Sequence, residues 1–312
     1  MILITGGTGF IGRALVRQLV EANYPVRLLI RPSNQSPNLP RGIPVEAAIC
    51  SLNDSRGLRS AMVDVETVYH LIGGEWRGVR ANLLQTDIQS AQAVTRAAGE
   101  ANVKRLFMVS HLGADRASAY PVLKAKGIAE EYVRRSGIDY TILRSGIVYG
   151  KGDSFTSGLA RLLHAFPLVF LLPGEGSMLL QPLWVEDLAT SLVWALDNNA
   201  ARNQVFEVGG PEFLPFQQIV QLVMETLNIQ RRLVSIPPAY LRILTIFLEQ
   251  SFPGLPVSIY WLDYLASNRI CKLDALPQIF DLMPGRFSQH LAHLKGENWR
   301  RSLFQNLMRK TN

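Results

Sequence analysis

Short apolar runs alternate with amphipathic segments along the first half of the chain. Nearly uniform apolar runs predict buried strands, and they occur at 2–5, 25–30, 45–49, 67–72, 105–110 and 140–143. Segments with apolar residues at helical spacing separate several of these runs, at 10–22, 58–62, 87–98 and 125–135. Apolar strands that alternate with helices are typical of a parallel sheet covered on both faces. We therefore expect an α/β fold built on a doubly wound parallel sheet.

This alternation weakens after about residue 150. Helical patterns follow at 185–196, 216–227 and 239–249, and the apolar run 205–208 resembles a late strand that returns to the sheet. The 239–249 segment is apolar on nearly every face, but Arg242 and Glu249 interrupt it too early for a membrane span, so it predicts a buried helix. We expect a first domain over 1–150 and a smaller, mostly helical, interleaved domain over 151–312.

The composition is that of a globular protein, with 48% hydrophobic and 18% charged residues. This balance excludes a disordered or collagen-like chain. Cys50 and Cys271 fit neither a disulfide framework nor a zinc cluster, and five scattered histidines offer no ligand spacing, so no metal is expected. The chain starts at Met1 without a charged segment before an apolar one, which predicts no secretory signal and a cytoplasmic location.

The net charge of +7 requires an anionic partner, and most of the excess lies in residues 286–312. That segment has one acid, Glu297, and six bases: Arg286, Lys295, Arg300, Arg301, Arg309 and Lys310. Apolar and aromatic residues are interleaved with these bases. The pattern fits docking at an anionic membrane surface or on a partner protein, and it equally fits a C-terminal helix that packs on its own domain. Nucleic acid is not expected, because no aromatic stacking platform accompanies the basic residues.

Three glycines, Gly6, Gly9 and Gly12, lie between the first predicted strand and the first predicted helix. In this context the spacing predicts a dinucleotide-binding loop, in which the glycines permit a tight turn, a close approach of the pyrophosphate and close helix packing. The helix N-terminus supplies free N–H groups to the phosphates. The residues between the glycines that we expect to contact the dinucleotide are Thr8, Phe10 and Ile11.

The end of the second strand distinguishes the two nicotinamide dinucleotides. An NAD site usually has an acid there for the ribose 2′-hydroxyl, whereas this chain has Arg31 and no acid between Glu21 and Glu46. Arg31 and Ser33 are suited to hold a 2′-phosphate through charge-assisted hydrogen bonds. The sequence therefore favours NADP(H) over NAD(H), with a solvated loop arginine as the alternative interpretation of Arg31.

Several further motifs follow predicted strands. They read TGGTGFIG at 5–12, HLIGG at 70–74, VSHLGA at 109–114, YTILRSG at 140–146 and FEVGGP at 206–211. Together they resemble the atypical short-chain dehydrogenase/reductases, an epimerase/dehydratase-like branch of the Rossmann proteins. Within that family the chain is most similar to the group named after the NADPH-binding accessory subunit of respiratory complex I. The resemblance implies a Rossmann domain over 1–150 and a substrate or docking domain over 151–312.

The resemblance also implies a Ser/Thr–Tyr–Lys set, in which a tyrosine exchanges a proton and a lysine four residues later contacts the ribose. Tyr120 and Lys124 give that spacing literally, but Lys126 alone has the family's glutamate at Glu130 and its Thr-Ile-Leu-Arg strand. Counting back from Lys126 puts Val122 at the tyrosine position. Two residues rotate a helix by about 200°, so the two registers exclude each other. We favour Lys126 as the ribose-contacting residue and keep Tyr120 with Lys124 as the alternative.

The hydroxyl member of the set is equally altered. Ser110 ends its predicted strand, and the position after it is His111, which either acts as an acid or forms part of the pocket wall. By resemblance, the remaining residues expected to line the dinucleotide are Ser51, Leu52, Leu71, Ile72, Gly73, Ser145 and Gly146.

Two functions follow. The first is binding of NADP(H) without the standard Tyr–Lys chemistry, in a structural, sensing or assembly role linked to a respiratory complex or to quinone metabolism. The alternative is an active NADP(H)-dependent oxidoreductase, or an epimerase or dehydratase acting on a sugar nucleotide, with a small-molecule substrate. The sequence itself names no substrate.

Overall fold

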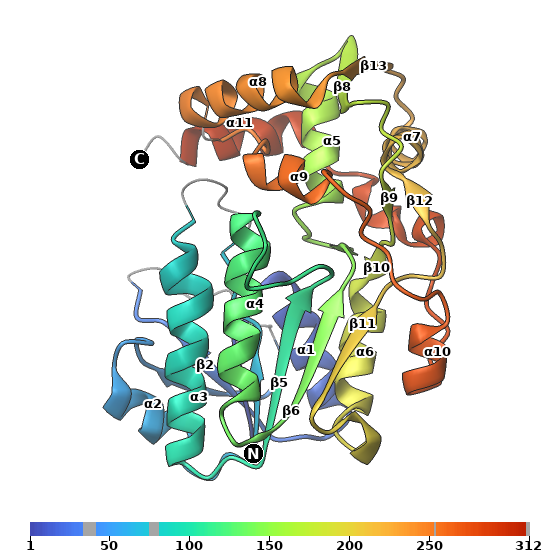
Figure 1. Ribbon diagram of the computed structural model, residues 1–312. Coiled ribbons are helices and arrows are strands. Elements are labelled where there is room, and N and C mark those ends of the chain that lie inside the picture. Colours follow the sequence, from blue (N-terminus) through green and yellow to red (C-terminus); the bar gives the residue numbers. More distant parts are fainter. Residues whose placement is uncertain (34–41, 75–80, 253, 310–312) are drawn as a thin grey trace.

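A seven-stranded parallel sheet forms the centre of the computed structural model, which describes residues 1–33, 42–74, 81–252 and 254–309 (Figure 1). Its order is β11-β6-β5-β4-β1-β2-β3, and every pairing in it is parallel. The strands are β1 (Ile2–Thr5), β2 (Val26–Ile30), β3 (Glu46–Ile49), β4 (Thr67–His70), β5 (Arg105–His111), β6 (Asp139–Ser145) and β11 (Gln204–Val208). The predicted doubly wound α/β fold is confirmed.

Helices cover both faces of this sheet, and successive side chains of each strand alternate between the two cores. In β1, Ile2 and Ile4 pack in the core beneath α1 (Phe10–Glu21) and α6 (Val185–Trp194), whereas Leu3 enters the opposite core. That second core lies beneath α2 (Ser55–Ala61), α3 (Ser90–Glu100) and α4 (Pro121–Arg134). This packing explains the uniformly apolar strands, because both faces are covered.

The second half of the chain adds helices and three short strand pairs. The helices are α5 (Thr156–Ala165), α7 (Phe216–Leu227), α8 (Pro238–Ser251), α9 (Ile259–Tyr264), α10 (Ala275–Phe280) and α11 (Trp299–Arg309). The pairs are β7 (Val148–Tyr149) with β10 (Leu183–Trp184), β8 (Val169–Pro173) with β13 (Arg232–Ile236), and β9 (Leu179–Leu180) with β12 (Leu214–Pro215). Single turns occur at η2 (Leu84–Gln89, a π-helix), η3 (Asn199–Ala201), η4 (Phe287–His290) and η5 (Ala292–Leu294).

The two halves share secondary structure. β11 pairs with β6 at one edge of the sheet, and α6 packs against α1, so elements from the second half complete the first. We propose, as the sequence predicts, that a boundary near residue 150 divides the chain into two interleaved domains.

One structural prediction was wrong. The 239–249 segment forms α8, but its buried side chains form only a narrow stripe of Leu241, Thr245 and Glu249. The periodicity could not reveal this, because a helix that is apolar on every side has no polar face to mark the solvent side. Within the described ranges no helix is long and apolar enough to cross a membrane.

Candidate functional site

The loop between β1 and α1 contains two glycines, Gly6 and Gly12, at which any side chain would collide with backbone atoms. Gly6 has a φ of +77°, and a Cβ there would lie 2.8 Å from the carbonyl oxygen of Leu71. A Cβ on Gly12 would lie 2.3 Å from the carbonyl oxygen of Gly6. The loop therefore brings the start of α1 against both β1 and the turn after β4.

This geometry fits a dinucleotide phosphate. The N-cap residue of α1 is Gly9, which makes no side-chain cap hydrogen bond, so the first N–H groups of the helix remain available to an anion. Thr8, Phe10 and Ile11 surround this end of α1, and the Thr8 carbonyl accepts a hydrogen bond from Arg13 at 2.9 Å.

The other predicted dinucleotide contacts follow neighbouring strands at the same edge of the sheet. Arg31 and Ser33 follow β2, and Arg31 is exposed. The backbone N–H of Leu71 donates to the Thr5 carbonyl at 3.0 Å, which fixes the turn after β4 beside β1. The remaining positions in this row are Ser51 and Leu52 after β3, and Ile72 and Gly73 after β4.

The edge continues at β6. Ser145 is buried, and its hydroxyl donates to the Ser110 carbonyl at 3.3 Å. The N–H of Gly146 donates to the Val208 carbonyl at 2.8 Å, which ties this turn to β11. The carboxyl ends of β4, β5 and β6 therefore meet at one edge, where ligands of open α/β sheets bind.

Lys126 of α4 and Asp87 of η2 form a buried ion pair. Lys126 Nζ lies 2.8 Å from Asp87 Oδ1, and the two residues are 3% and 2% exposed. Asp87 Oδ2 also accepts a hydrogen bond from the Gly74 N–H at 3.2 Å. Val122 lies one turn before Lys126 on α4 and is also buried.

Sequence reasoning missed Asp87. It lies on η2, at the start of the apolar stripe that continues through Ala91, Val94 and Ala98. A carboxylate in line with apolar positions at helical spacing was a signal of a buried, paired acid.

The alternative pair lies differently. Lys124 is exposed, whereas Tyr120 is the N-cap residue of α4 and Pro121 is its first residue. The Tyr120 ring lies 6.0 Å from the guanidinium carbon of Arg269. Lys124 and Lys126 thus lie on opposite sides of α4.

His111 lies among aromatic rings that the sequence did not identify. Its ring centroid is 6.3 Å from those of Tyr260 and Tyr264, both on α9. The hydroxyls of Ser110 and Tyr264 are buried and have no hydrogen-bond partner among the described residues. Burial raises the pKa of the Tyr264 phenol, and the nearby Arg269 charge opposes that shift only in part. These residues lie about 150 positions apart in the chain, so no local pattern could join them.

His70, the last residue of β4, contacts the end of β1 and the start of α3. Its Nδ1 lies 2.9 Å from Thr5 Oγ1 and its Nε2 lies 3.3 Å from Ser90 Oγ. Burial, with a contribution from the Lys126 charge, lowers the pKa of His70 to about 3. This histidine is therefore neutral at physiological pH.

Part of the 286–312 segment packs into the core of the second half of the chain. Phe287, Leu291, Leu294 and Trp299 are buried in the core of the second half. Among the described side chains, the large apolar ones that α11 leaves exposed are Phe304 and Met308. Residues 310–312 lie outside the described ranges.

Among the described residues, no three His, Cys, Asp or Glu side chains lie close enough together to hold a metal ion.

A glycine-rich βα turn, a parallel sheet and a row of turns at the strand ends define a dinucleotide-binding Rossmann protein. The family model described as NAD(P)H-binding matches residues 6–158. The NAD(P)H azoreductase of Xenophilus azovorans is 30% identical over 220 residues, which are 69% of each chain. This chain belongs to the NAD(P)H-binding family.

Other comparisons agree with this assignment. NADH dehydrogenase (ubiquinone) 1 alpha subcomplex subunit 9, mitochondrial, of Arabidopsis thaliana is 27% identical over 243 residues, which are 75% of this chain and 60% of that protein. The match thus spans less than two thirds of that relative. The NADPH complex of an NADPH-dependent quinone oxidoreductase from Escherichia coli has the same fold, with a TM-score of 0.73, 20% identity and coverage of 94% and 99%.

Proposed function

We propose that this protein binds NADP(H) and holds it in a structural, sensing or assembly role, without the standard Tyr–Lys chemistry of short-chain dehydrogenase/reductases. The name of the Arabidopsis relative, a subunit of an NADH dehydrogenase, supports a role linked to a respiratory assembly or to quinone metabolism. Peripheral attachment to a membrane surface fits such a role.

The observation that carries this proposal is the pair of side chains that α4 buries one turn apart. When bound, a reduced nicotinamide would supply a hydride to a carbonyl carbon, and the carbonyl oxygen would then need a proton. In the register that makes Lys126 the ribose-contacting lysine, Val122 takes the position of the tyrosine, and its side chain has no acidic proton to give. The Lys126 ammonium lies 2.8 Å from Asp87, so its charge is balanced within the protein instead of acting on a phenol.

The preference for NADP(H) rests on Arg31. This exposed arginine follows β2 directly, and no acid lies between Glu21 and Glu46 to receive a ribose 2′-hydroxyl. The guanidinium supplies the donors that a 2′-phosphate needs, and Ser33 adds a hydroxyl.

A second candidate function is an active NADP(H)-dependent oxidoreductase, or an epimerase or dehydratase of sugar nucleotides. The buried hydroxyls of Ser110 and Tyr264, without hydrogen-bond partners in the described part of the chain, favour it. Such groups are available to a substrate oxygen. A tyrosine phenol is protonated at neutral pH, and burial raises the pKa of Tyr264 further, so this hydroxyl is a hydrogen-bond donor.

The two functions are separated by measuring retained dinucleotide and turnover on the same preparation. We expect NADPH to be released on denaturing the purified protein, with no hydride exchange toward quinones, aldehydes or nucleotide sugars. Turnover of any of these compounds would favour the enzyme. In that case Tyr264→Phe and Tyr120→Phe identify the donor, and loss of turnover in Tyr120→Phe would assign the reaction to Tyr120 and Lys124.

A further inference from the structure

Helix α8 exposes large apolar side chains along most of its surface. Tyr240, Ile243 and Phe247 are 69%, 67% and 60% exposed, and Leu244 lies between them. Positions 240, 243, 244 and 247 have the spacing of one helical face. Ile246 and, just after the helix, Phe252 are exposed as well. A contiguous face of this kind on a globular protein marks an interaction site.

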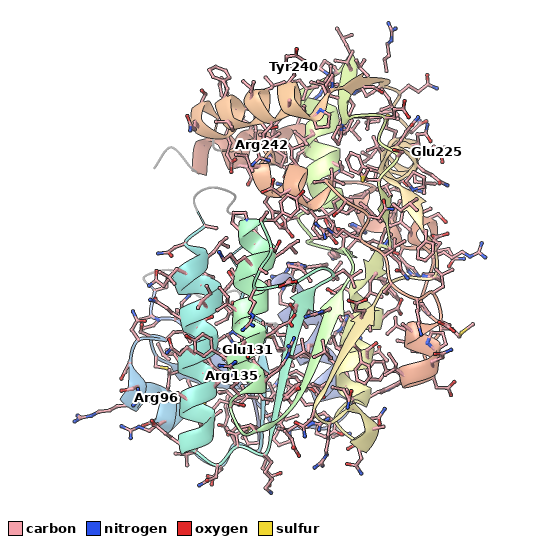
Figure 2. All side chains as sticks on the ribbon, in the orientation of Figure 1. Arg96, Glu131, Arg135, Glu225, Tyr240 and Arg242 are labelled. Atoms are coloured by element: carbon pink, nitrogen blue, oxygen red, sulfur yellow. The ribbon has the colours of Figure 1, made fainter. Side chains whose placement is uncertain are left out.

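The opposite side of α8 attaches it to the domain. Leu241 and Thr245 are buried, and Glu249 accepts a hydrogen bond from the Ile259 N–H at 3.2 Å. Arg242 donates to Asp263 of α9 at 2.7 Å, and Figure 2 shows Arg242 on the side of α8 toward α9, with Tyr240 on the outer side. The exposed apolar face is therefore the side of α8 that points away from these contacts.

Helix α11 lies next to the end of α8. A Cβ on Gly254, three residues after α8, would lie 2.4 Å from the Leu307 Cα. Phe304 and Met308 of α11 are exposed, so this helix adds two large apolar side chains to the surface. Both helices lie at the end of the molecule remote from α2 (Figure 1).

Two exposed arginines lie at the start of α11, and one exposed acid, Glu297, lies two residues before the helix. α11 contains Arg300 and Arg301, both exposed, and no acid anywhere in its sequence. The acids next to the apolar face, Glu249 and Asp263, are buried and already engaged. A surface that presents apolar side chains beside an excess of arginines is complementary to a layer of anionic headgroups above hydrocarbon.

Helix length decides how such a surface meets a bilayer. The 14 residues of α8 extend about 21 Å, shorter than the roughly 30 Å hydrocarbon core, so the helix can lie in the interface and cannot cross it. We propose that α8, with the exposed part of α11, is a docking surface for an anionic lipid bilayer. This proposal depends only on the exposed side chains of α8 and α11, and it does not depend on the proposed role of the dinucleotide.

The test is co-sedimentation of the full-length protein with vesicles of phosphatidylcholine, with and without phosphatidylglycerol. We expect binding to the anionic vesicles and a loss of at least about tenfold in the double variant Ile243→Glu/Phe247→Glu, because two large side chains no longer enter the interface. Val63→Glu is the matched control, since Val63 is 57% exposed and follows α2 at the other end of the molecule. Arg300→Gln/Arg301→Gln should weaken binding to the anionic vesicles by about fivefold per arginine and leave neutral vesicles unaffected.

Thermal melting and NADPH binding of each variant establish that it is folded. If the double variant does not fold, Tyr240→Glu/Phe304→Glu tests the same surface with two other exposed side chains. Unchanged sedimentation of a folded variant, or no binding by the unmodified protein, overturns the proposal. The proposal is also overturned if the unmodified protein does not bind vesicles but forms an oligomer, and the double variant is monomeric. The apolar face would then be a protein interface.

Discussion

The ammonium group of Lys126 lies 2.8 Å from the carboxylate of Asp87, and water reaches neither side chain to a significant extent. Asp87 also accepts the Gly74 N–H, so the pair ties α4 to the segment that follows β4. A buried pair of this kind adds little net stability compared with apolar residues, but breaking it leaves an uncompensated charge. The stability of the folded protein should therefore depend on Lys126 and Asp87 being present together.

Removing one partner should destabilise the protein much more than removing both. Asp87→Asn leaves the Lys126 charge buried and unpaired, which costs about 3–5 kcal/mol in the free energy of unfolding. The double variant Asp87→Leu/Lys126→Met should recover most of that loss. Urea unfolding of the dinucleotide-free protein measures both, and a double variant less stable than Asp87→Asn would contradict the coupling.

If Lys126 contacts the ribose, replacing Lys126 weakens dinucleotide binding. Replacing Lys124 does not. The folded Asp87→Leu/Lys126→Met protein should bind NADPH at least about tenfold more weakly, from the loss of a hydrogen bond to a charged group. Lys124→Met is the control, because Lys124 is exposed on the other side of α4. Titration calorimetry decides between the registers: weaker binding in Lys124→Met alone would assign the contact to Lys124.

The close approach at Gly12 gives a prediction for the phosphate loop. Gly12→Ala places a methyl group 2.3 Å from the Gly6 carbonyl oxygen, so the loop must open and NADPH binding should fall below detection. Gly99→Ala is the control, because a Cβ at Gly99 in α3 meets nothing within 4 Å. That second change should leave the Kd unaltered and raise stability by about 0.5–1 kcal/mol. Equal NADPH binding by both variants would exclude this loop as the phosphate site.

Much of the sheet could be predicted from the sequence, because its signals are local. β1 and β4 were visible as apolar runs, and the glycine loop marked the turn between β1 and α1. Contacts between distant segments could not be predicted in the same way. The apolar stripe of α3 begins with Asp87 on η2, but it does not show that Lys126 is the partner of Asp87.

The exposure of α8 illustrates a different limit. Ile243 and Leu241 are two residues apart and equally apolar, yet one is 67% exposed and the other 8%. Burial depends on whether another element covers a given side, and periodicity is informative only when polar residues mark the uncovered side. The same limit applies to Tyr264, whose place beside His111 is set by the packing of α9.

Arg31 should determine which nicotinamide dinucleotide binds better. Arg31→Ala removes the donors offered to a 2′-phosphate, so affinity for NADPH should fall at least about tenfold while affinity for NADH changes little. Arg56→Ala, at an exposed arginine on α2, controls for the loss of one positive charge. Titrations of both dinucleotides into both variants provide the measurement. A parallel loss for NADH and NADPH would show that Arg31 does not contact the 2′ position.

The buried His70 predicts how stability depends on pH. Its pKa is about 3 in the folded protein against 6.5 when unperturbed, so between these values the unfolded chain binds a proton that the folded protein does not. The free energy of unfolding should therefore fall as the pH decreases from about 6.5, by up to about 1.4 kcal/mol per pH unit from this group. His70→Asn keeps a polar group toward Thr5 but cannot titrate, so this part of the slope should disappear even if the variant is less stable at neutral pH. His164→Gln, at a partly exposed histidine on α5, should keep the slope. Urea unfolding from about pH 7 to pH 4.5 compares the three proteins, and a slope in His70→Asn equal to that of the unmodified protein would assign the acid sensitivity to other groups.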